Sequence, residues 1–177
     1  MNKNLVLGIT GSIAAYKAPE IIRRFQEKDY IVSSIMTKEA ESFISALTIS
    51  SLLKAGKFYQ SNFLEDYSGD IPHIKLAQEA DVFLIAPATA NIISKIAYGI
   101  ADDLLTCIAL ATRAKIVLAP SMNVNMYMNN IIQDNCKRLV DYGIKIVEPK
   151  EGVLACGDTG KGRLADIDEI IDVVENL

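Results

Sequence analysis

The sequence predicts an α/β fold: a doubly wound parallel sheet with helices on both faces, in a single domain over residues 1–177. Strands are predicted at residues 5–9, 31–36, 82–86, 116–119 and 144–147, and the first, third and fourth of these are apolar runs of the kind typical of strands buried on both faces. Helix-periodic segments separate these runs, which is the spacing of βαβ units. Small polar residues follow several runs, at the sheet edge where such folds bind ligands. The expected architecture is therefore Rossmann-like, of the flavodoxin-like kind.

Composition excludes several classes of protein. The chain is 50% hydrophobic with a net charge of −4 and shows no basic stripe, which argues for a soluble protein and against a nucleic-acid binder. No apolar run approaches the roughly 18 residues of a membrane span, and no signal-peptide pattern opens the chain. One histidine and three cysteines without C-x-x-C spacing make zinc and a disulfide framework unlikely. The default expectation is a cytoplasmic protein without a metal.

The first strand and helix form a candidate phosphate site. Asn4–Thr10 is predicted as a buried strand, Gly11 and Ser12 as its turn, and Ile13–Lys28 as a helix whose free N–H groups suit a phosphate. The dinucleotide fingerprint G-x-G-x-x-G is absent, and the second strand ends at Thr37, where NAD binding would call for an acidic residue. These features favour a mononucleotide over NAD. A Gly-Ser turn without a ligand is the alternative.

The stretch Ile85–Asn91 is the centre of the predicted site. The strand Val82–Ala86 is expected to end at Pro87, which has no N–H to donate to the sheet, and a helix is expected over Ile92–Ile100. The next strand ends in the same way, with Pro120-Ser121-Met122-Asn123. Because parallel strands end at the same edge, the two loops should face one crevice.

The only histidine, His73, opens a short predicted helix just before the central strand. Histidine titrates near neutral pH and suits a general base, although a lone histidine is more often structural or on the surface. Upstream, residues 40–53 are expected to be partly helical, and Gly56–Asp70 to be an irregular loop with ligand or partner contacts.

A glycine-rich stretch, residues 148–165, is predicted to form an active-site flap. Cys156 lies within it, between Ala155 and Gly157, and is a candidate reactive thiol. Cys107 and Cys136 fall on apolar helix positions and are expected to be inert.

With these residues laid out, the sequence resembles the homo-oligomeric flavin-containing cysteine decarboxylases. Five motifs carry the resemblance in order along the chain: Gly11–Lys17, His73–Leu76, Pro87–Asn91, Pro120–Met126 and Ala155–Asp158. Two departures are conservative: Thr89 and Ile92 alter the family's P-A-S-A-N-T, and Tyr127 replaces its usual tryptophan.

The resemblance implies a role for each site residue. FMN phosphate would lie on Gly11, Ser12, Thr37 and Thr89, and the rest of the flavin would contact Ala88, Asn91 and Met122. His73 would be the catalytic base and Cys156 the acid. The substrate would be held by Asn123, itself also catalytic, and by Met126, Ala155, Gly157 and Asp158, with Lys17 on its pantothenoyl or phosphate part.

The resemblance also implies an activity: FMN-dependent decarboxylation of 4′-phosphopantothenoylcysteine to 4′-phosphopantetheine in coenzyme A synthesis. The flavin would oxidise the cysteine carbon before carbon dioxide leaves and return the hydride afterwards. A homotrimer or dodecamer, and a separate synthetase that supplies the substrate, are implied as partners. The alternatives are a peptidyl-cysteine oxidative decarboxylase that releases an enethiol, a flavin prenyltransferase, and a non-catalytic regulatory flavoprotein.

Overall fold

A computed structural model describes residues 3–61, 71–153, 157 and 159–177. Its centre is a six-stranded parallel sheet in the order β3-β2-β1-β4-β5-β6. The strands are β1 (Asn4–Ile9), β2 (Ile31–Met36), β3 (Phe58–Gln60), β4 (Val82–Ala88), β5 (Lys115–Pro120) and β6 (Lys145–Ile146). This is the doubly wound Rossmann order, and the five strands without the short edge strand β3 follow the flavodoxin-like order. The predicted fold class is confirmed.

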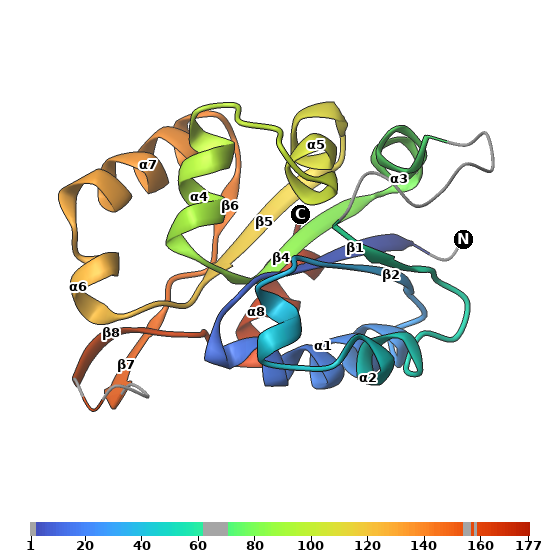
Figure 1. The fold of residues 1–177 in the computed structure, drawn as a ribbon, viewed down its shortest axis with the longest axis horizontal. Coiled ribbons are helices and arrows are strands. Elements are labelled where there is room, and N and C mark those ends of the chain that lie inside the picture. Colours follow the sequence, from blue (N-terminus) through green and yellow to red (C-terminus); the bar gives the residue numbers. More distant parts are fainter. Residues whose placement is uncertain (1–2, 62–70, 154–156, 158) are drawn as a thin grey trace.

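Helices cover both faces of the sheet (Figure 1). One face carries α1 (Ala18–Gln26), α2 (Ala46–Ser50) and α8 (Ile167–Glu175), and the other carries α3 (Pro72–Glu79), α4 (Ala90–Ala97), α5 (Leu104–Ala111) and α7 (Asn130–Asp141). Two short 3-10 helices, η1 (Ile13–Lys17) and η2 (Ala40–Ser42), and the one-turn helix α6 (Val124–Tyr127) lie in the loops. Each face has its own apolar cluster, so the central strands β1 and β4 are buried on both sides.

The predicted helix Ile13–Lys28 is divided in the structure. Ser12 caps η1, with its hydroxyl accepting from the Ala14 N–H, and α1 then begins at Ala18. Pro19 lies in the first turn of α1 rather than inside a longer helix. The reason is that proline has no N–H for an intrahelical bond, and at a helix start none is needed.

Two strands run further than predicted. β4 continues through Pro87 to Ala88, which pairs with Pro120 at the end of β5, and the Ala86–Pro87 peptide bond is cis. A register shift between Ile85 and Ala88 carries the pairing past the proline, whose nitrogen cannot donate. Both strand ends therefore reach the crevice as ordered backbone.

The irregular loop predicted over Gly56–Asp70 begins with a strand instead. Phe58–Gln60 forms β3, parallel to β2 at the edge of the sheet. Gly56 lets the chain approach β2, because a Cβ there would overlap the Val32 carbonyl group. Residues 62–70 lie outside the described residues.

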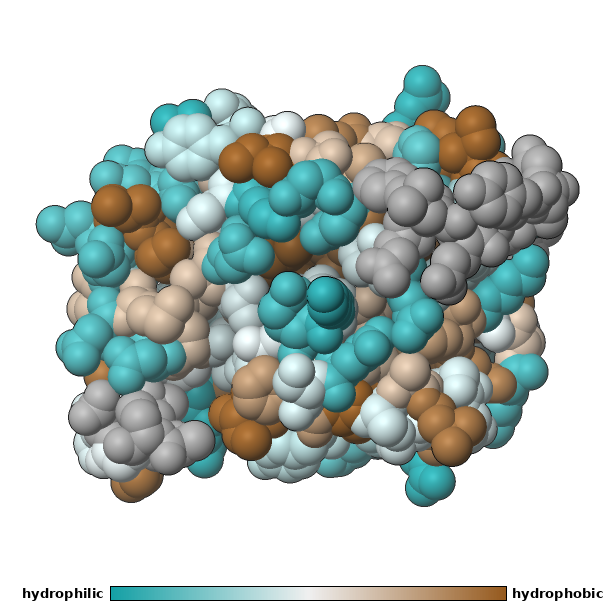
Figure 2. Space-filling view, in the orientation of Figure 1, coloured by the Kyte–Doolittle hydropathy of each residue, from teal (hydrophilic) through white to brown (hydrophobic). Residues whose placement is uncertain are grey.

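The stretch that follows β6 forms an antiparallel hairpin of β7 (Lys150–Val153) and β8 (Thr159–Arg163). It projects from the sheet beside α6 (Figure 1). In the space-filling view, apolar residues on this face form separate groups between hydrophilic ones (Figure 2). None of the helices in the described ranges is long and apolar enough to span a membrane.

Candidate active site

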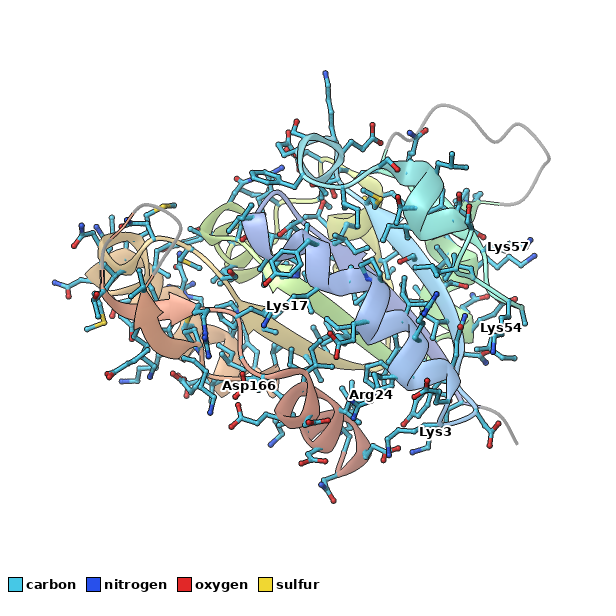
Figure 3. The ribbon with its side chains drawn as sticks, turned by 90° about the horizontal axis from the view of Figure 1, so that it is seen from below. Lys3, Lys17, Arg24, Lys54, Lys57 and Asp166 are labelled. Atoms are coloured by element: carbon cyan, nitrogen blue, oxygen red, sulfur yellow. The ribbon has the colours of Figure 1, made fainter. Side chains whose placement is uncertain are left out.

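A cavity of about 730 Å³ opens at the carboxyl ends of β1, β2, β4 and β5. This is the edge of the sheet where doubly wound folds bind ligands. It brings together most of the predicted site residues: Gly11, Ser12, Lys17, Thr37, Thr89, Asn91, Met122, Asn123 and Met126. Figure 3, seen from below, shows Lys17 at the start of α1, with Asp166 at the neighbouring start of α8.

One end of the cavity is lined by hydroxyl groups at helix starts. The Thr89 hydroxyl caps α4 by accepting from the Ile92 N–H at 3.4 Å, and the Thr37 hydroxyl accepts from the Ala40 N–H at 3.3 Å. Each hydroxyl therefore keeps a proton that it can donate to an anion. The positive end of the α4 dipole lies at the same place. This end is suited to a phosphate.

Gly11 leaves room between the first turn and the residues that follow β2. A Cβ on Gly11 would lie 2.5 Å from the Glu39 Cβ and 3.2 Å from the Glu39 carbonyl carbon. Real Cβ atoms do not approach this closely, so the backbone cradle requires glycine.

Two buried hydroxyl residues at this end were not assigned a role from the sequence. Thr10 donates from its Oγ1 to the Pro87 carbonyl at 2.7 Å and accepts from the Thr89 N–H at 3.1 Å, which joins the ends of β1 and β4. Ser121 accepts from the Ser12 hydroxyl at 3.2 Å. The signal that could have found them is a polar residue directly after a fully buried strand.

Another wall of the cavity comes from the loop after β5. Asn123 caps α6, its side-chain oxygen accepting from the Asn125 N–H at 2.8 Å. This bond fixes the side chain, so the amide group is held at the cavity wall. Met122 and Met126 line the cavity beside it and supply a polarisable apolar surface.

Some predicted site residues are not among those that line the cavity. Ala88 is fully buried within β4, His73 lies in the first turn of α3, and Gly157 is exposed with a φ of 89°. Ala155, Cys156 and Asp158 lie outside the described residues. The cavity of one chain thus gathers most of the expected flavin residues and part of the expected substrate residues, without His73.

Charged residues line the cavity as well. Lys17 comes from the residue before α1, Arg163 from the end of β8, and Asp103 is the cap of α5. Asp103 is held by a capping box with Thr106 and is 3.8 Å from the Lys95 ammonium group. Both cations line the cavity, where they can meet anionic groups of a ligand.

The described cysteines are poor nucleophiles. Burial, and then the nearby Glu148 charge, raise the pKa of the Cys136 thiol to about 11. Burial and the carboxylates of Asp103 and Asp102 raise the pKa of Cys107. Since the thiolate is the reactive form, both behave as the inert thiols that the sequence predicts, although Cys107 is only half-buried.

The cavity fits a flavin mononucleotide. Its phosphate could lie against the glycine cradle and the hydroxyls of Ser12, Thr37 and Thr89, and the apolar wall around Met122 could hold a flat ring. No group of three or more potential metal ligands occurs among the described residues.

A known protein family matches the whole of this chain. The model of the Flavoprotein family matches residues 1–177. The chain belongs to the Flavoprotein family. A "Probable phosphopantothenoylcysteine decarboxylase" from Streptococcus mutans is 44% identical to this flavoprotein over 177 residues, which cover 99% of this chain and 98% of the relative. The "Coenzyme A biosynthesis bifunctional protein CoaBC" of Haemophilus influenzae is 40% identical over 99% of this chain, but the chain spans only 44% of that protein.

Solved structures share the fold. A Cys-to-Ser mutant of PPC decarboxylase complexed with pantothenoylaminoethenethiol superposes with a TM-score of 0.90 at 30% identity, covering 99% of this flavoprotein and 98% of that chain. The FMN-dependent cysteine decarboxylase SpaF has a TM-score of 0.83 at 32% identity, covering 97% and 94% of the two chains.

Proposed function

We propose that this flavoprotein is an FMN-dependent carboxy-lyase that converts 4′-phosphopantothenoylcysteine to 4′-phosphopantetheine in coenzyme A biosynthesis. The observation that carries the proposal is the full-length similarity, at 44% identity, to a relative named as a probable phosphopantothenoylcysteine decarboxylase. The cavity supports it, since an end suited to a phosphate and the residues proposed to hold the substrate lie within one crevice.

The residues divide into two groups by what they would hold. FMN would be held by Gly11, Ser12, Thr37, Thr89, Asn91 and Met122, with Ala88 behind the residues that line the cavity. Bound FMN would supply the hydride acceptor that cysteine decarboxylation needs. The substrate carboxylate would bind the Asn123 amide, and Met126 would pack beside it. Lys17 would meet the substrate phosphate as a cation.

His73 and Cys156 complete the proposed chemistry. His73 would remove a proton from the substrate and Cys156 would return one, each as a general acid or base. Cys156 belongs to the proposed flap over residues 148–165, where Ala155, Gly157 and Asp158 would contact the substrate.

We further propose a homo-oligomer, a trimer or an assembly of trimers. His73 does not line the cavity of its own chain, so a second copy is the natural source of the base. Exposed apolar side chains also surround the cavity mouth, from Ile13, Tyr16, Phe43, Met126 and Val153. Such a patch is typical of an interface.

The enzyme would act in the cytoplasm, where the substrate would come from a phosphopantothenoylcysteine synthetase. The CoaBC relatives are named as bifunctional proteins, which supports a close link between the decarboxylase and a second activity. A peptidyl-cysteine decarboxylase is the second candidate, because SpaF is a cysteine decarboxylase with a similar fold.

The test is mass spectrometry of the product after the FMN-loaded protein meets 4′-phosphopantothenoylcysteine. A saturated thiol that has lost only carbon dioxide is the expected result. A product two hydrogens lighter would indicate an oxidative decarboxylase that releases the enethiol. No product, with FMN bound, would reject this substrate.

A further inference from the structure

One carboxylate joins the β7–β8 hairpin to α6. Glu148, just before β7, accepts a hydrogen bond from the Tyr127 hydroxyl at 2.9 Å and pairs with the Lys161 ammonium at 2.6 Å. Both contacts are made by the same oxygen, Oε2. Tyr127 belongs to α6 and Lys161 to β8, so this carboxylate links two elements that are distant in sequence.

The tyrosine side of this link is rigid. The Tyr127 ring is buried, and its backbone carbonyl accepts from the Gln133 side chain on α7 at 2.6 Å. The Lys161 ammonium lies 5.8 Å from the centre of the same ring, within the range of a cation–π contact. The ring is therefore buried and its backbone is bonded to α7, so Tyr127 can serve as the anchor for the hairpin.

The charges of the link favour its bonded form. Burial works to raise the pKa of the Glu148 carboxyl, but hydrogen bonds from Lys161 and Tyr127 outweigh it and hold that pKa below its usual value. Burial and the bond to Glu148 raise the pKa of Tyr127 well above its usual value. At neutral pH the pair is therefore a carboxylate and a phenol that donates to it.

Backbone contacts continue the link as far as the cavity. The Met122 N–H donates to the Gly162 carbonyl at 3.0 Å. Gly162 allows this approach, because a Cβ there would overlap the Met122 carbonyl oxygen, and a Cβ on Gly160 would lie 2.6 Å from the Val124 Cγ2. The hairpin strand and the β5–α6 loop are thus in direct contact.

The joined segments form one wall of the cavity. Met122, Asn123 and Met126 line it from the β5–α6 side, and Val153, Gly162, Arg163 and Leu164 line it from the hairpin side. A shift of the hairpin would change the distance between these two sides, and misplacement of about 1 Å can cost a factor of about 100 in rate.

We propose that Tyr127, Glu148 and Lys161 are positioning residues, which fix the hairpin against α6 and so set the width of the substrate wall. The substrate in this statement rests on the proposed function, while the placement of the hairpin does not. None of the three residues lines the cavity, so they act through Met122, Asn123 and Gly162.

The experiment compares Glu148→Gln, Lys161→Met and Tyr127→Phe with matched controls in the FMN-loaded, full-length protein. Lys150→Met removes the same charge from the same hairpin, but Lys150 pairs with Glu169 on α8. Tyr142→Phe removes the hydroxyl of an exposed tyrosine. For each variant, kcat and KM for 4′-phosphopantothenoylcysteine, FMN content and hydrogen exchange of the Met122 amide are measured.

We expect Glu148→Gln and Lys161→Met to lower kcat/KM about tenfold, mainly through KM, with FMN content unchanged. Exchange of the Met122 amide should become faster in both. Lys161→Arg should restore activity, since a guanidinium can donate to the same carboxylate. The double variant Tyr127→Phe with Glu148→Gln should have the same kcat/KM as Glu148→Gln alone, because the two substitutions break the same link.

A lower Tm with unchanged kcat/KM and unchanged exchange would mean that the three residues only add stability, which overturns the proposal. An equal loss in Lys150→Met would also overturn it. If the wild-type protein leaves 4′-phosphopantothenoylcysteine unchanged, the proposed function fails, and exchange of the Met122 amide alone decides the placement of the hairpin.

Discussion

At the scale of single residues, the end of the cavity that is suited to a phosphate requires glycine at position 11. Gly11→Ala would bring a Cβ to 2.5 Å from the Glu39 Cβ, so the turn must move away from Thr37 and Thr89. Overpacking of this kind costs about 1–3 kcal/mol, which corresponds to roughly a tenfold to hundredfold weaker Kd for FMN. The Kd for FMN is measured by flavin fluorescence during titration of the apoprotein.

Gly152→Ala is the control for that titration. Its added Cβ would meet only the Arg163 side chain at 3.8 Å, which is ordinary contact, and Gly152 does not line the cavity. FMN affinity should stay at the wild-type value. Wild-type affinity in Gly11→Ala would show that the phosphate lies elsewhere.

Individual residues also show that a sequence pattern does not by itself predict whether a side chain is buried. Ile131 and Val140 fall on the apolar stripe of α7, yet both are exposed. Periodicity gives the direction of a side chain from its helix, whereas burial depends on what packs there. Thr10 shows the converse, because its two hydrogen bonds depend on β1 and β4 being neighbours.

At the scale of elements, the long buried strands were predictable and the short edge strand was not. β1, β4 and β5 contain apolar runs because both of their faces are covered. β3 has only three residues and pairs on one side with β2, so little apolar pattern marks it. The cavity was predictable because the carboxyl ends of parallel strands meet at one edge, whatever the details of the loops.

The contribution of the hairpin–α6 link to the stability of the protein should depend on pH, and the sign of that dependence follows from the pKa of Glu148. The pKa of Glu148 is lowered in the fold, so its ionised form contributes stability above its unfolded-state pKa, about 4.3, and the contribution is lost as the pH falls through the lower folded value. The Tm advantage of the wild-type protein over Glu148→Gln should be constant from about pH 6 to 7 and disappear in acid.

The Tm of the wild-type protein and of Glu148→Gln is measured by thermal unfolding, from neutral pH down into acid. The Glu148 side chain is well exposed, so a small difference in Tm is expected. Glu169→Gln, which removes a carboxylate that pairs with the hairpin from α8, is the control for the loss of a charge. A difference that persists unchanged in acid would show that Glu148 is not held as a carboxylate by Lys161 and Tyr127.

At the scale of the whole molecule, the position of His73 outside the cavity predicts an enzyme that one chain cannot complete. His73 lies on α3 while Asn123 lies at the cavity wall, so the proposed base and the amide proposed to bind the carboxylate should come from different chains. His73→Ala and Asn123→Ala should each be inactive alone. A hybrid trimer that contains both variants should regain about a third of wild-type activity, because one of its three interfaces joins an intact His73 to an intact Asn123.

Co-expression with two different affinity tags, followed by sequential purification, gives the hybrid oligomer for this measurement. Light scattering checks that both parents assemble like the wild type, and flavin absorbance checks that both retain FMN. An assembled but inactive hybrid would mean that His73 serves the cavity of its own chain, in which case α3 must move for the base to reach the substrate. Restored activity would assign the cavity rim, with its exposed Ile13, Tyr16 and Val153, to the contact between copies.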